Sequence, residues 1–109
     1  MIIDFHTHTF EEYIVDKALD KLSHSANVIS YIEGTDAALH NSNEEDNIAL
    51  SVSLPVATKI MQSDKINAKN VKKNGRTDDT GLLYFAAIHP EDSNISARLS
   101  NIKAAGFKG

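Results

Sequence analysis

Strand-like and helix-like segments alternate along the whole chain, and this order constrains the fold more than any other feature of the sequence. Three segments rich in apolar and β-branched residues, at positions 2–8, 49–56 and 82–88, predict strands. Segments with helical spacing or helix-capping residues separate them. Because parallel neighbours need a long connection back, the alternation predicts an α/β fold with a parallel sheet and right-handed crossovers.

The first predicted helix carries the clearest apolar stripe. Thr9 and Glu12 have the spacing of a capping box, which favours a helix start at this point. Five apolar residues then follow at helical spacing, and we expect this stripe to face the sheet: Ile14, Val15, Ala18, Leu19 and Leu22.

The later helices are indicated mainly by their ends. Thr35 is a predicted N-cap of a short helix, and Asn47 follows it as a residue able to take the left-handed turn. A polar helix is predicted over residues 63–73, with Asn74 and Gly75 as its stop. A last helix is predicted to open at Ser93 and to close at Gly106.

The length of the chain limits how many strand-helix units it can form. At about 30 residues per strand-helix unit, 109 residues hold three units and the start of a fourth, whereas a closed eight-unit barrel needs roughly 250 residues. Residues 1–109 therefore cannot be a complete barrel, and we expect residues 107–109 to begin a fourth strand.

Charge and composition exclude some functions. The net charge of -4 comes from 15 acidic and 11 basic residues spread along the chain, so no basic patch indicates nucleic acid or an anionic membrane. Without cysteine, a metal site must use histidine, carboxylate and water. The N-terminus has no secretory pattern and no run reaches about 20 apolar residues, which leaves a cytoplasmic location as the expectation.

The first predicted strand contains the strongest chemical signal. Asp4, His6 and His8 are spaced by two, so we expect their side chains to leave one face of the strand near its carboxyl end, where such barrels have their active sites. The competing interpretation is that His-x-His arises by chance. Burial of these three groups side by side without a counterion would cost several kcal/mol, which favours a metal site.

The sequence resembles the amidohydrolase superfamily. Residues 3–8, Ile-Asp-Phe-His-Thr-His, look like its opening Asp-x-His-x-His strand. Residues 54–58, 85–92 and 105–109 resemble, in order and spacing, the amidohydrolase-2 group of metal-dependent hydrolases and decarboxylases. The resemblance covers essentially the whole chain, as the N-terminal portion of such a protein. It implies that residues 1–109 are one partial domain, the N-terminal three βα units of a TIM-type (β/α)8 barrel.

This resemblance implies that His6 and His8 bind a divalent metal ion, with zinc as the expected ion, and that Asp4 supports them. It implies hydrolysis or decarboxylation of a small organic substrate through a metal-activated water. The family's other metal ligands and its catalytic aspartate lie on later strands, so no catalytic residue is assigned here. A catalytic zinc site takes three protein ligands, and we therefore expect the longer parent to be the enzyme and the 109 residues alone to be inactive.

Three other histidines lie outside the first predicted strand. His89 follows the third predicted strand, and two interpretations stand equal: a substrate-binding residue facing the same cavity, or a strand-end side chain bound to backbone. We predict His24 and His40 to be solvated surface residues without a role.

Several alternatives remain open. A PHP-like phosphoesterase or TatD-like deoxyribonuclease also begins with a similar strand, although Phe10-Glu11-Glu12-Tyr13 follows here in place of Ser-Asp-Gly. The chain could also be an inactive fragment or an assembly partner, self-associating through exposed sheet edges or the uncovered inner face. Substrate, metal identity and oligomeric state are not predicted.

Overall fold

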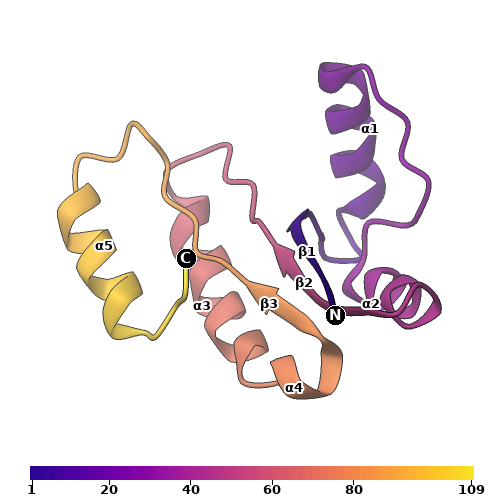
Figure 1. Ribbon diagram of the computed structural model, residues 1–109. Helices are drawn as coiled ribbons and strands as arrows, with labels where there is room; N and C mark the ends of the chain where they lie inside the picture. Colours follow the sequence, from indigo (N-terminus) through magenta and orange to yellow (C-terminus); the bar gives the residue numbers. More distant parts are fainter.

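The computed structural model describes all residues from Met1 to Gly109 and has a three-stranded parallel sheet at its centre (Figure 1). The strands are β1 (Ile2–Thr7), β2 (Ile48–Ser53) and β3 (Leu82–Tyr84), in the order β1-β2-β3. The helices are α1 (Val15–Ala26), α2 (Asp36–Glu45), α3 (Gln62–Asn74), α4 (Thr77–Thr80) and α5 (Ile95–Ala104). The predicted α/β class and parallel sheet are confirmed.

Three helix ends follow the predicted chemistry. The Thr35 hydroxyl accepts a hydrogen bond from the backbone N–H of Ala38 at 3.2 Å, as an N-cap does. Asn47 has φ 56°, in the left-handed region that its short polar side chain tolerates. Gly106 has φ 85° just after α5, where the absence of a Cβ removes the steric cost.

The start of α1 differs from the prediction. The helix begins at Val15 and has no side-chain cap, because the hydroxyl of Thr9 lies 3.0 Å from the Ser53 hydroxyl at the end of β2 instead. The predicted capping box is therefore wrong. Of the expected apolar stripe only Val15 is buried, and a Cβ on Gly34 would meet the side chains of Val15 and Leu19, so this face packs on the segment leading into α2.

The two faces of the sheet differ. Ser51 on β2 donates to the Asn43 side chain of α2 at 3.0 Å, so alternate residues of β2 face the helices. On the other face the rings of Phe5 and Phe85 meet edge to face across β2, with centroids 6.3 Å apart. Val52 lies on β2, the central strand, and its side chain has no exposed surface. Phe5 itself is 64% exposed, so this second face is only partly covered.

The third strand is shorter than the predicted 82–88. The ladder ends because β2 runs into Pro55, which has no N–H to donate, and the last bond between the two segments is Phe85 N–H to the Ser53 carbonyl at 3.1 Å. Residues beyond it use other partners. The Ala86 N–H donates to the carbonyl of Gly109 at 2.8 Å, so the end of the chain lies along the free edge of this segment.

Asparagine side chains of α3 bind the backbone of β3 and of the segment that follows it. Asn74 accepts from the Tyr84 N–H and donates to the Tyr84 carbonyl, both at 2.8 Å. Asn67 does the same at Ala87, at 2.7 and 2.9 Å, and Asn70 donates to the Phe85 carbonyl at 3.1 Å. These amides take the place of a neighbouring strand, which explains how so polar a helix packs on the sheet.

Candidate metal centre and polar cavity

His6 and His8 come together at the carboxyl end of β1. Their Nε2 atoms are 3.2 Å apart, and the two rings are nearly perpendicular at 79°. Both residues are exposed, so a ligand can reach them. The predicted proximity of the two imidazoles is confirmed.

The second nitrogen of His8 is fixed by the backbone. Its Nδ1 lies 2.7 Å from the carbonyl oxygen of Leu54, just after β2. A carbonyl only accepts, so Nδ1 carries the proton and Nε2 keeps its lone pair toward His6. Metal-binding histidines commonly have this arrangement, in which one nitrogen donates to a backbone carbonyl and the other binds the metal.

Asp4 contacts the pair through the main chain only. Its Oδ1 accepts a hydrogen bond from the His6 N–H at 3.1 Å. The strand register shifts between Asp4 and Thr7, which interrupts the strict alternation on which a common face for Asp4, His6 and His8 was predicted. No third histidine, aspartate or glutamate joins His6 and His8 to make a three-ligand cluster.

His89 lies in the loop after β3 and is half-buried. Its Nδ1 accepts a hydrogen bond from the Glu91 N–H at 3.3 Å, as the backbone-bound interpretation describes. Because Nδ1 accepts, Nε2 carries the proton and can donate to another group.

The prediction for His40 is wrong. This side chain on α2 is half-buried, and its Nδ1 lies 2.8 Å from the carbonyl oxygen of Thr80 at the end of α4. It therefore joins two helices and binds a helix-terminal carbonyl, which charged or donor side chains stabilise. His24 is exposed on α1, as predicted.

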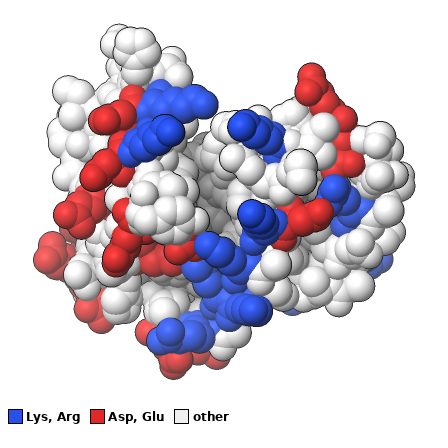
Figure 2. All heavy atoms as spheres, turned by 180° about the vertical axis from the view of Figure 1, so that it is seen from behind, with Lys and Arg blue, Asp and Glu red and all other residues white.

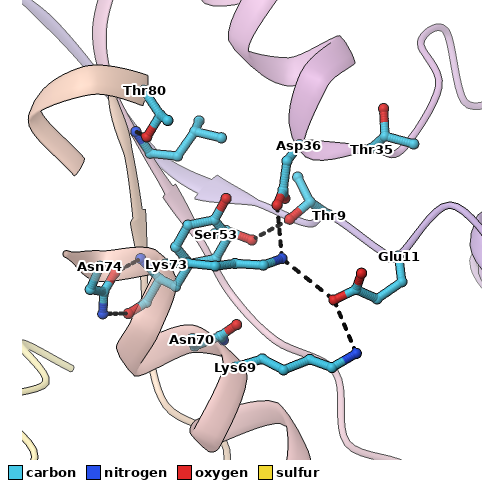
Figure 3. Close-up of polar contacts among 12 residues, drawn as sticks. Thr9, Glu11, Thr35, Asp36, Ser53, Lys69, Asn70, Lys73, Asn74 and Thr80 are labelled. Carbon is cyan, nitrogen blue, oxygen red and sulfur yellow. Dashed lines mark hydrogen bonds and ion pairs between the residues drawn. The ribbon is translucent and has the colours of Figure 1, made fainter. Parts of the chain in front are cut away.

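A cluster of charged side chains lies on the helix side of the sheet (Figure 3). From the sequence alone, these residues were assigned no role. Lys73 of α3 lies 2.8 Å from Asp36 and 3.7 Å from Glu11, and Lys69 lies 3.3 Å from the same Glu11 oxygen. The Lys73 ammonium also lies 4.9 Å from the centroid of the Tyr84 ring. The sequence indicated this cluster only through the spacing of four between Lys69 and Lys73, because the acidic partners of the two lysines are distant in sequence.

The pKa values in this group follow from burial and charge. Burial by itself raises the pKa of Asp36, but the hydrogen bond from Lys73 and the charge of its ammonium outweigh burial and hold that pKa below its ordinary value. Burial, together with the negative charge of Asp36, raises the pKa of Tyr84. The carboxylate of Asp36 is therefore ionised and the phenol of Tyr84 neutral at neutral pH.

No protein-family model, curated protein or solved structure matches the chain. None of the helices combines the length and the hydropathy needed to cross a lipid bilayer.

Proposed function

We propose that this chain is the N-terminal part of a cytoplasmic metal-dependent hydrolase or decarboxylase of the amidohydrolase type, built on a (β/α)8 barrel of which the three parallel strands are the beginning. His6 and His8 are the residues that would hold the metal. The observation that carries the proposal is the 3.2 Å separation of their Nε2 atoms, together with the backbone contact of His8.

The donor geometry fits a zinc ion. Two nitrogens bound tetrahedrally at ~2.0–2.1 Å from one zinc ion lie about 3.3–3.4 Å apart. The observed 3.2 Å is close to this value, and the Leu54 carbonyl holds the His8 ring in the tautomer that a metal requires. When bound, a divalent ion supplies Lewis acidity toward a carbonyl-type group and lowers the pKa of water.

The remaining residues of the site act through hydrogen bonds. Asp4 holds the backbone of His6, which supports the position of that imidazole. His89 presents a protonated Nε2 that would donate to an oxygen of the substrate, and this is its proposed substrate-binding role. Two protein ligands leave coordination positions open, so a chain that carried the later ligands would complete the catalytic site.

The open positions make a direct test possible. Acetohydroxamate, which binds zinc through a carbonyl and an adjacent oxygen, should bind the zinc-loaded chain and should not bind the metal-free chain in isothermal titration. The His6→Ala variant should lose this binding, whereas the matched His24→Ala variant should keep it. Equal acetohydroxamate binding with and without zinc would contradict the proposed role of the metal.

One observation favours a second function, assembly with another copy. β1 is an edge strand, and its Ile2, Ile3 and Phe5 side chains are 55%, 40% and 64% exposed. An unpaired edge beside exposed apolar residues is a ready template for strand pairing. We propose that the chain self-associates through β1.

Sedimentation equilibrium tests this assembly. A concentration-dependent dimer is expected, and Ile3→Lys should shift it to monomer because a charge on an edge strand opposes pairing. Tyr31→Lys, at an exposed position outside the sheet, is the control. A monomer at every micromolar concentration would refute self-association.

A further inference from the structure

A cavity of about 250 Å³ lies on the helix side of the sheet, and its lining does not include His6 or His8. Its walls come from the loop after β1, the carboxyl end of β2 and one face of α3. In parallel α/β folds, ligands bind beyond the carboxyl ends of the strands, and this cavity lies there. Figure 2 shows a central hollow on this side of the molecule, with basic side chains gathered beside it.

The charges that line the cavity are unequal. Lys65, Lys69 and Lys73 follow one face of α3 at a spacing of four, and Glu11 is the only acidic residue in the lining. Glu11 lies within 4.0 Å of Lys69 and Lys73, whereas Lys65 makes no ion pair. Asp36, outside the lining, also pairs with Lys73 at 2.8 Å. Three ammonium groups therefore face two carboxylates, and the one positive charge in excess, at Lys65, favours a further anion.

Glu11 shows which anion fits. One oxygen of its carboxylate lies 3.3 Å from the Lys69 ammonium and 3.7 Å from that of Lys73, so a carboxylate already bridges the two cations (Figure 3). The side chain comes from a loop, between β1 and α1, and is partly exposed. A ligand carboxylate at this position would compete directly with Glu11.

The rest of the cavity lining suits the apolar part of a small organic ligand. Ile14, Val56 and Ile66 supply apolar walls. Asn70 donates through Nδ2 to the Phe85 carbonyl, which leaves its Oδ1 without a protein partner. Small-molecule sites combine apolar walls with a few polar groups that fix orientation.

We propose that this cavity binds a small organic carboxylate with an apolar body, which displaces the Glu11 carboxylate from between Lys69 and Lys73. Lys65 contributes additional positive charge. The proposal is independent of the metal centre, because neither His6 nor His8 lines the cavity.

Titration of the ¹⁵N-labelled chain with phenylacetate, followed by NMR, tests the site. Amide shifts should concentrate at Thr9, Ser53 and Asn70. Lys65→Ala should raise the Kd about two- to fivefold, as expected for one exposed charge. Glu11→Gln should lower the Kd because it removes the internal competitor, and a merely structural role of Glu11 would not produce tighter binding.

The control is Lys72→Ala, which removes the same charge from α3 at an exposed position outside the lining. This variant should bind phenylacetate as the unchanged chain does. An equal loss of affinity in Lys65→Ala and Lys72→Ala would overturn the proposal, as would Glu11→Gln binding no more tightly. Inorganic phosphate should bind more weakly than phenylacetate; equal binding would show general attraction of anions and overturn the proposal too.

Discussion

The Asn74→Ala variant is expected to lose about 1 to 3 kcal/mol of unfolding free energy, measured by urea denaturation followed by circular dichroism. Asn74 makes two hydrogen bonds of 2.8 Å to the N–H and the carbonyl of Tyr84, a residue that is 4% exposed. Alanine would leave both backbone groups without partners. An unsatisfied buried group costs its full desolvation penalty, about 1 to 3 kcal/mol, and helix propensity returns only part of it.

Two further variants identify the cause. Asn74→Asp keeps an acceptor for the Tyr84 N–H but brings a carboxylate against the Tyr84 carbonyl, so it should also destabilise the fold. Asn101→Ala, an exposed asparagine of α5 whose side chain makes no hydrogen bond, should change the unfolding free energy by less than about 0.5 kcal/mol. A loss in Asn74→Ala no larger than that in Asn101→Ala would show that the asparagines of α3 do not hold β3.

The parts of the fold that could be predicted from sequence depend on local chemistry. Thr35 and Asn47 act on backbone within a few residues of themselves, and their helix was predicted with nearly its observed limits. His6 and His8 are likewise only two residues apart, and their imidazoles meet as predicted although the strand register shifts beside them. In each case the two interacting groups lie close in sequence, so the local sequence pattern was enough to predict the contact.

The predictions that failed concern long-range partners. Thr9 has the spacing of a cap, but Ser53, 44 residues away, offers its hydroxyl a different partner. His40 appeared solvent-exposed from its polar neighbours, yet Thr80 is brought beside it by the turn of α4. A residue's preference for a local role is weak evidence when tertiary contacts compete for the same side chain.

The polar cavity and the asparagines of α3 were missed for the same reason. Lys69 and Glu11 are 58 residues apart, and Asn67 binds backbone 20 residues farther along the chain. In sequence α3 shows only a thin apolar face. Its packing on β3 depends on amide groups that hydropathy patterns count as solvent-exposed.

Zinc binding is the second large effect that we expect, and it depends on His6 and His8 together. Removal of an outer partner of a metal ligand commonly costs roughly 10- to 100-fold in affinity, and removal of a direct ligand should cost more. His6→Ala and His8→Ala should therefore each weaken zinc binding by more than about tenfold. His24→Ala removes an exposed histidine of α1 and should leave the zinc affinity unchanged.

A competing explanation exists for the same geometry. At 3.2 Å the two Nε2 atoms are also within hydrogen-bond distance, so His6 could donate to His8 without any metal. In that case the pair would be a local polar contact, and zinc would bind the chain no better than other surface histidines do.

X-ray absorption at the zinc edge of the zinc-loaded chain separates these explanations most directly. The metal-site account predicts two imidazole nitrogens at ~2.0–2.1 Å from zinc, reduced to at most one in His6→Ala and unchanged in His24→Ala. A zinc environment of oxygen ligands alone, or one that stays the same when His6 is replaced, would contradict it.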